Sequence, residues 1–325
     1  MHLDHPVNQS IQQIDETSWL FGDQILLTRQ NSPPPGCPSW GDGNGLYYVV
    51  SEPPSPMPPC RPLPEESHIQ KLYDAGGVSA VWRIGDAICK AKKYPDPNMT
   101  WEHITLDHLH NKCPLGQLSF AVPKVIHHAQ SKDRYFIIQS RIPGETLAEA
   151  WPSMDESTKE YYVSRIAGIC TELATWTGNG IHGVDGRNMS DLYLTPLHGI
   201  EDMSPQNLLR NCANLGMDCC KFVFYHCDLG PGNIIIDIGR GSLGVVDWEM
   251  AGFVPREWIR TKVRVSSGSD LPGGDDDSRQ DWRRRLQRRL GQDGFPEIAD
   301  RWMAWFMNDG NQEAKERRRT SCSGK

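Results

Sequence analysis

Short apolar runs, interrupted by glycine pairs and polar residues, follow one another in the first half of the chain after residue 70. Residues 78–84 and 86–92 are two such runs separated by a Gly-Asp step, which predicts a β-hairpin. A helix is expected around residues 100–110, and a second β pair at 122–127 and 134–140. The pattern therefore predicts a small β-rich region that contains one helix.

The second half of the chain changes to a helical period and then returns to strands. Residues 161–176 carry apolar side chains at the spacing of a buried helix. Three strand-like pieces follow at 222–225, 233–237 and 243–247, and residues 238–242 between the last two predict a short hairpin turn. A larger part with helices and a late hairpin is therefore expected after the β-rich region.

The first 64 residues have a different character. Between Ser32 and Pro64 the chain holds eleven prolines, and proline removes the backbone donors that helices and sheet interiors need. We therefore expect residues 1–64 to be a proline-rich arm or extension. Residues 311–325 are expected to form a polar, basic tail.

Composition narrows the classes of function. The 325 residues are 38% hydrophobic with a net charge of -7; an acidic chain argues against nucleic-acid binding as the main task. No apolar run approaches the roughly 18 residues of a membrane span. The N-terminus has no basic segment followed by an apolar stretch, so the cytosol is the expected location. These features favour a cytoplasmic protein whose main partner is neither nucleic acid nor a membrane.

The most informative polar residues stand between predicted strands. An apolar strand leads into His226-Cys-Asp228-Leu-Gly-Pro-Gly-Asn233, and the following hairpin ends in Asp247-Trp-Glu249. The hairpin would bring Asp247 back beside Asp228 and Asn233. Phosphoryl transfer needs such a set, because one carboxylate receives the proton of the acceptor while a carboxylate and an amide oxygen hold Mg²⁺. The alternative is that these are ordinary turn residues.

These two linked motifs resemble those of the aminoglycoside phosphotransferase and choline kinase group, in particular its fungal members. The resemblance covers roughly residues 70–265. It implies a two-lobed, protein-kinase-like α+β fold, with a β-rich N-lobe over residues 65–141 and a larger, mainly helical C-lobe over 142–310 that carries the catalytic hairpin. It also implies an ATP- and Mg²⁺-dependent small-molecule kinase that uses an alcohol group as acceptor.

The resemblance also implies roles for single residues. Asp228 would be the catalytic base, and His226 would orient the catalytic loop. Asn233 and Asp247 would be Mg²⁺ ligands, with Glu249 as a further candidate at the metal site. Two positions depart from the family pattern: Cys227 stands where glycine is usual, and Gly230 stands where a lysine or histidine is common.

A kinase-like site also needs a cation on the ATP phosphates and a carboxylate that holds this cation. Strand alternation places Lys90 on one face of the second hairpin strand, and Glu102 lies on the inward stripe of the predicted helix. We expect these two residues to pair, although an exposed strand lysine and a first-turn helix acid are the alternatives.

The turn before the first hairpin strand, with Gly76, Gly77 and Ser79, resembles the family's phosphate-covering loop. Glycine lets backbone N–H groups approach phosphate oxygens. A plain hairpin turn would have the same glycines.

Other functions and the acceptor stay open at this point. A catalytically silent nucleotide-binding or scaffold protein is one alternative, and a protein kinase is another, which Asp-Trp-Glu in place of Asp-Phe-Gly makes weaker. Several acidic residues outside the motif are either attractive to a cationic acceptor or ordinary surface carboxylates. They are Asp185, Asp191, Glu201 and the run 275–277.

Overall fold

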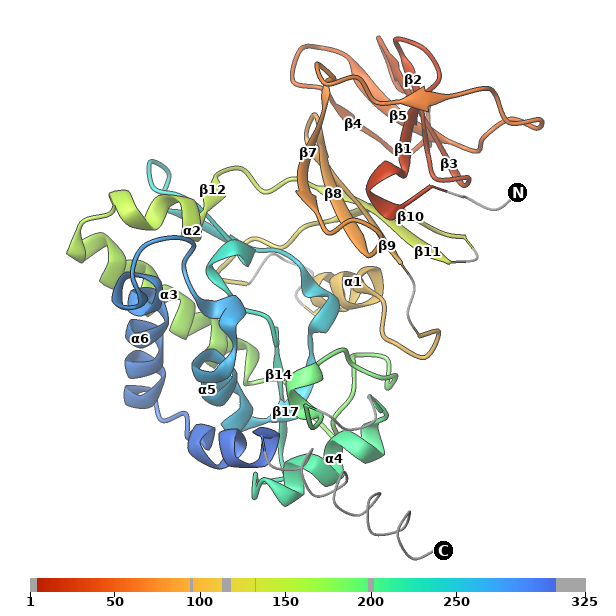
Figure 1. The fold of residues 1–325 in the computed structure, drawn as a ribbon. Coiled ribbons are helices and arrows are strands. Elements are labelled where there is room, and N and C mark those ends of the chain that lie inside the picture. The colour runs from red at the N-terminus through yellow and green to blue at the C-terminus, as the bar shows by residue number, and fades with distance from the viewer. Residues whose placement is uncertain (1–4, 94–95, 113–117, 132, 198–201, 308–325) are drawn as a thin grey trace, which may run out of the picture. The chain divides into compact units, whose positions relative to one another are not determined.

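The computed structural model describes residues 5–93, 96–112, 118–131, 133–197 and 202–307, and the chain divides into two compact units (Figure 1). The first unit comprises residues 1–97 and 123–142, and the second comprises 98–122 and 143–325. The first is built of strands and the second mainly of helices, so the expected α+β class with a β-rich first part is confirmed.

The first unit contains two antiparallel sheets. The six-stranded sheet has the order β4-β5-β3-β2-β1-β6, and the five-stranded sheet has the order β10-β11-β9-β8-β7. The short 3₁₀ helix η1 (Val7–Gln9) precedes β1. The strands are β1 (Ile11–Gln13), β2 (Ser18–Phe21), β3 (Ile25–Gln30), β4 (Ser39–Gly41), β5 (Tyr47–Ser51), β6 (Arg61–Pro62), β7 (Ile69–Asp74), β8 (Ser79–Ile84), β9 (Ala87–Lys93), β10 (Val125–Gln130) and β11 (Arg134–Ser140).

Alternation along β8 and β9 explains how the two sheets pack together. Ala87, Cys89 and Ala91 of β9 are fully buried, whereas the residues between them are half-buried. These small side chains and those of β8 share one core with apolar residues of the six-stranded sheet. The core residues of that sheet include Trp19, Phe21, Ile25, Leu27, Trp40, Tyr48 and Val50.

Residues 1–64 were expected to form a proline-rich arm, but they contain all six strands of the six-stranded sheet. The reason lies in the spacing of the prolines, because nine of the eleven fall in the loops 31–38 and 52–60 and leave the strands between these loops free. Pro62 lies in β6, an edge strand, where a missing N–H donor is tolerated. The observed units also differ from the expected lobes at one helix. Helix α1 (Glu102–Lys112) was expected in the N-lobe, but it belongs to the second unit. The expected tail, 311–325, lies outside the described residues.

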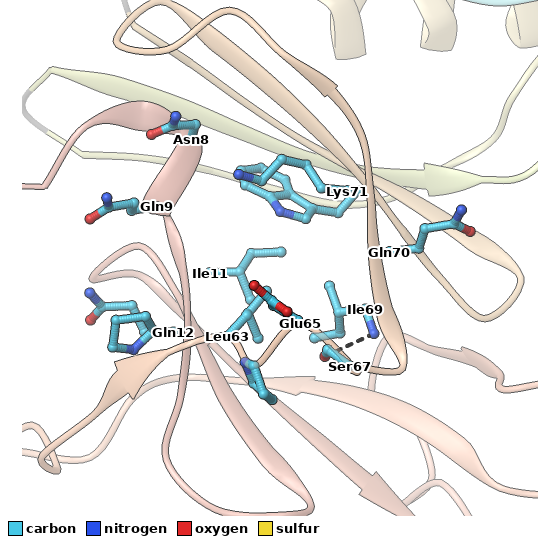
Figure 2. Close-up of a pocket in the computed structure, with 13 residues that line it drawn as sticks. Asn8, Gln9, Ile11, Gln12, Leu63, Glu65, Ser67, Ile69, Gln70 and Lys71 are labelled. Carbon is cyan, nitrogen blue, oxygen red and sulfur yellow. Dashed lines mark hydrogen bonds between the residues drawn. The ribbon is translucent and has the colours of Figure 1, made fainter.

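Figure 2 shows a pocket of about 490 Å³ in the first unit. It is lined by residues of the segments 8–12 and 62–71 and by Trp82. The Ile69 amide donates to Ser67 Oγ at 3.1 Å on its wall. None of the residues predicted to carry chemistry lines this pocket.

The second unit is mainly helical. Its α-helices include α1 (Glu102–Lys112), α2 (Leu147–Ala150), α3 (Glu156–Leu173), α4 (Pro205–Asn214), α5 (Arg256–Val265) and α6 (Asp276–Gln292). Its 3₁₀ helices are η2 (Trp151–Ser153), η3 (Leu192–Leu194), η4 (Pro231–Asn233), η5 (Trp248–Met250) and η6 (Ser267–Ser269). Helix α6 packs on α3 and α5 through its buried Trp282, Leu286 and Leu290. Within the described ranges, no helix is both long and apolar enough to cross a membrane.

Two small sheets in this unit carry the loops of interest. One has the order β12-β15-β16 and the other β13-β14-β17. The strands are β12 (Glu145–Thr146), β13 (Thr177–Gly178), β14 (Phe222–Tyr225), β15 (Ile234–Asp237), β16 (Ser242–Val245) and β17 (Gly252–Pro255). All four residues of β14 are buried, which fixes the point from which the following loop starts.

Candidate active site

The loop after β14 and the end of the β15–β16 hairpin come together as the sequence predicts. Ile234 at the start of β15 pairs with Val245 at the end of β16. The Val246 amide then donates to the carbonyl of Asn233 at 3.0 Å. The two polar segments, 226–233 and 247–249, are therefore joined by backbone hydrogen bonds.

His226 links these two segments through its ring. Its Nδ1 accepts a hydrogen bond from the Asp228 amide at 3.2 Å, so the proton belongs on Nε2, which donates to the carbonyl of Val246 at 2.9 Å. The ring is fully buried and stands edge-on to Trp248, with 4.6 Å between ring centroids. The contacts of His226 fix the loop backbone on both sides.

Asp228 and Asn233 contact each other directly. The Asn233 amide nitrogen donates to the Asp228 carbonyl at 2.9 Å and to Asp228 Oδ2 at 3.0 Å. Among the residues that the structure describes, neither Asp228 Oδ1 nor the Asn233 side-chain oxygen has a hydrogen-bond partner. Both oxygens are thus available to a bound ligand or ion.

The electrostatic surroundings of Asp228 disfavour its charged form. Burial raises the pKa of the Asp228 carboxyl above its ordinary value, and the negative charges of Asp247 and Asp191 act in the same direction. The charge of Lys262 and the hydrogen bond from Asn233 oppose this rise in the pKa. A half-buried carboxyl with a raised pKa accepts a proton more readily than an exposed one.

Three carboxylates gather at the end of the hairpin. One oxygen each from Glu102, Asp247 and Glu249 lies within 4.8 Å of the others, and the Trp248 amide donates to Glu102 Oε1 at 3.3 Å. Carboxylate oxygens are the ligands that Mg²⁺ prefers, so this cluster fits a divalent cation. Sequence reasoning gave Glu102 a different role, as the partner of Lys90. The cluster therefore holds one carboxylate more than was predicted for it.

Two residues of the site have a left-handed backbone. Cys227 has a φ of 63° and Asp247 a φ of 66°, and they are the two non-glycine residues with positive φ in the described part of the chain. This conformation favours glycine, which explains why glycine is usual at position 227. The Cys227 side chain is fully buried, and burial raises the pKa of its thiol.

The second departure from the family pattern, Gly230, has a steric reason. A Cβ atom at this position would lie 2.3 Å from the carbonyl oxygen of Gly268. The segment around η6 therefore occupies the space that a lysine or histidine at position 230 would need.

Sequence reasoning missed the pair Asp191–Lys262. Asp191 was taken for a surface carboxylate or a cation attractor, but its side chain is fully buried and forms a direct ion pair with Lys262 of α5. The Trp258 indole N–H donates to Asp191 Oδ2 at 2.8 Å. The two charged residues are 71 positions apart, so no local pattern could have found them.

Asp275, the first residue of the acidic run, is the N-cap of α6, and its side chain accepts from the Ser278 amide at 2.9 Å. Asp185 accepts from the Thr100 hydroxyl at 2.5 Å. Both therefore serve local structure in the described part of the chain. Glu201 lies outside the described residues.

The remaining predicted residues belong to the first unit. Lys90 lies on the half-buried face of β9, opposite the core face, as the alternation predicted. Gly76, with a φ of 62°, and Gly77 form the turn between β7 and β8, and Ser79 begins β8. The Asn8 amide donates to the Gly76 carbonyl at 3.0 Å, so η1 supports this turn. The pairing of Lys90 with Glu102 stays a prediction.

Comparison with known proteins agrees with these motifs. Residues 74–258 match the model of the phosphotransferase enzyme family. A search of the curated proteins found no match.

Among solved structures, an aminoglycoside-3'-phosphotransferase of type VIII is similar at 12% identity and a TM-score of 0.43, with 73% of this chain and 91% of that chain covered. Monomeric WbdD is similar at 16% identity and a TM-score of 0.34, with 69% and 45% covered.

The family match includes every polar residue of the loop after β14 and of the hairpin end. It spans more than half of the 325 residues. On this match, the chain belongs to the phosphotransferase enzyme family.

Proposed function

We propose that this protein transfers the γ-phosphate of ATP to the hydroxyl group of a small molecule in a Mg²⁺-dependent reaction. The observation that carries the proposal is the Asp228 carboxylate, which is oriented by Asn233 through one oxygen and whose other oxygen has no partner in the described part of the chain. An acceptor hydroxyl within hydrogen-bond reach of Oδ1 could pass its proton to Asp228.

The metal site would be formed by oxygen atoms of the hairpin end and the catalytic loop. Asp247, Glu249 and the side-chain oxygen of Asn233 are the candidate ligands, and Glu102 extends the carboxylate cluster. A bound Mg²⁺ would neutralise the charge on the phosphates. Asp247 has a left-handed backbone, and strained residues of this kind are common at functional sites.

The first unit would supply the nucleotide contacts that the family resemblance implies. Lys90 would contact the ATP phosphates, and the backbone N–H groups of Gly76 and Gly77, with the Ser79 hydroxyl, would cover them. A cytosolic location and a small-molecule partner belong to the same proposal.

The proposal is tested by a thermal-shift titration of the purified protein with ATP, with and without Mg²⁺, because a ligand that binds the native state raises its stability. We expect stabilisation that needs Mg²⁺ and is lost in Asp247→Ala. Asp228→Ala should still bind ATP but transfer no phosphate. Asp237→Ala, at the far end of the same hairpin, is the matched control. It loses the hydrogen bond from the Arg240 amide, so its melting temperature without ligand should fall, but the shift caused by ATP and Mg²⁺ should equal that of the unmodified protein.

Two results would contradict the proposal. Full turnover in Asp228→Ala would show that Asp228 is not the base. No stabilisation at millimolar nucleotide would favour a catalytically silent scaffold.

A further inference from the structure

The segment Ser266–Asp270, which we call the 266–270 turn, lies next to the catalytic loop and is tied to two helices. The Ser266 amide donates to the Lys262 carbonyl at 3.0 Å, which continues the last turn of α5. From α6, Arg283 donates to the Ser266 carbonyl at 3.2 Å and lies 3.2 Å from Asp270 Oδ1. Both ends of the turn are therefore anchored to helices.

The 266–270 turn lies close to the proposed base. Its Gly268 carbonyl abuts Gly230 of the catalytic loop. A Cβ atom built on Gly268 would lie 3.6 Å from Asp228 Oδ1 and 3.4 Å from Ser266 Oγ; of the residues that the structure describes, its own chain neighbours aside, no other places a heavy atom within 4 Å. Gly268 is exposed. The space over Gly268 is therefore open on the side of the described residues, and it borders the Asp228 oxygen for which they supply no partner.

This space lies at the distance where an acceptor must be placed. A hydroxyl that donates to Oδ1 at a normal O–H···O distance puts its own carbon atom roughly 3.5 Å from Oδ1. The position of a Cβ on Gly268, at 3.6 Å, falls at that same distance. A side chain here would compete with the hydroxyl-bearing carbon of the acceptor for the space beside the base.

Ser266 adds a polar group to the same space. The residue as a whole is 4% exposed, and its hydroxyl has no hydrogen-bond partner among the residues described. The hydroxyl oxygen is not one of the fully buried unpartnered atoms in the described part of the chain, so it reaches the open space over Gly268. It can therefore form a hydrogen bond with an acceptor there.

We propose that the 266–270 turn is a wall of the acceptor site, in which Gly268 leaves room for the hydroxyl-bearing carbon and Ser266 donates to or accepts from the acceptor. The inference rests on the proposed phosphotransfer function. In the step, the acceptor hydroxyl gives its proton to Asp228 and its oxygen forms the new bond to the γ-phosphorus of ATP. The bond from that phosphorus to the bridging oxygen breaks, and ADP leaves with the electron pair.

The test compares transfer to water with transfer to organic hydroxyls, measured as ADP release from ATP and Mg²⁺. The probes are water alone and a panel of ethanolamine, choline, glycerol, glucose and kanamycin. The variants are Gly268→Ala and Ser266→Ala, with Ser267→Ala on the same turn as control because Ser267 is exposed. The alanine at 268 makes only ordinary contacts and its φ is not left-handed, so we expect it to fold.

We expect Gly268→Ala to lower kcat/KM for every accepted organic hydroxyl by at least about tenfold, because misplacing a reacting group by a fraction of an ångström is costly. Hydrolysis by water should stay within about threefold, since a water molecule has no carbon to place. Ser266→Ala should raise the KM for the acceptor about fivefold, the effect of one hydrogen bond. Ser267→Ala should change neither reaction.

The inference is overturned if Gly268→Ala and Ser266→Ala both keep full transfer to organic hydroxyls, or if hydrolysis by water falls in step with transfer. It is also overturned if the unmodified protein hydrolyses ATP but uses no compound of the panel. A protein that neither binds nor hydrolyses ATP contradicts the proposed function itself, which separates the two failures.

Discussion

Breaking the buried ion pair between Asp191 and Lys262 should strongly lower the free energy of unfolding, because both side chains are almost fully buried. The side chains of Lys262 and Asp191 are 3% and 0% exposed. Lys262→Met keeps most of the side-chain volume but leaves the Asp191 carboxylate buried, and the donors that remain to it among the described residues are neutral, Trp258 Nε1 and the Tyr193 amide. Removing one partner of a buried pair costs about 3–5 kcal/mol.

The double variant Asp191→Asn with Lys262→Met gives the decisive comparison. It removes both charges, so no uncompensated charge stays buried, and its loss of stability should be about 1 kcal/mol or less. Urea unfolding followed by tryptophan fluorescence measures all the variants. A cost below about 1 kcal/mol for Lys262→Met alone would refute the argument, because it would show that Asp191 does not need its cationic partner.

The same substitution has a second consequence at the site. The charge of Lys262 lowers the pKa of Asp228, in opposition to the effect of burial. Lys262→Met should therefore raise the pKa of Asp228 further. The acid limb of the pH profile of kcat/KM should move to higher pH, whereas a substitution that only loosened the fold would lower activity at every pH.

Three further predictions concern the catalytic loop. Asp228→Asn should abolish transfer. At pH values above the pKa of the native Asp228 carboxyl it should also raise the melting temperature, because burial raises that pKa and so penalises the charged form that the substitution removes. This gain should vanish as the pH falls below about 3.8, where the carboxyl is neutral in the folded and the unfolded protein. A melting temperature that is unchanged at pH 7 would contradict this. Cys227→Gly should be about 1 kcal/mol more stable than Cys227→Ala in urea unfolding, because only glycine relieves the left-handed backbone; equal stabilities would show that the backbone there is unstrained. Gly230→Ala should cost about 2 kcal/mol or more and impair transfer, because its Cβ meets the Gly268 carbonyl; a variant as stable as the unmodified protein would disprove the close packing.

The catalytic hairpin could be predicted from the sequence because the residues that define it lie close together along the chain. An apolar strand, a polar loop and a second hairpin follow one another within 28 residues, from Phe222 to Glu249. Hairpin pairing then brings the ends of the strands together, as the hydrogen bond from Val246 to Asn233 records. The catalytic roles of the single residues were inferred from the resemblance to the family motif, and these roles stay predictions.

The residues that surround this hairpin could not be predicted, because their contacts join distant parts of the chain. Asp191 meets Lys262 across 71 residues, and the Trp248 amide meets Glu102 across 146. Gly268 carries no side chain that a pattern could reveal. Gly268 matters because it lies close to Asp228, and only folding brings these two residues together.

The N-terminal strands were missed for a different reason. β1, β2 and β4 are three or four residues long, too short for an alternating pattern to stand out. The many prolines after residue 32 then led us to predict an arm for the whole segment, although all of them except Pro62 lie outside its strands.

The family match begins at residue 74, inside β7, whereas the core of the first unit extends back to Val7. A shortened protein that began at the family boundary would lose the entire six-stranded sheet. The apolar side chains of the remaining sheet, among them Trp82, Ile84, Phe136 and Ile138, would then face water. An apolar surface of that kind promotes aggregation. Recombinant production of this phosphotransferase therefore needs the residues upstream of the family region.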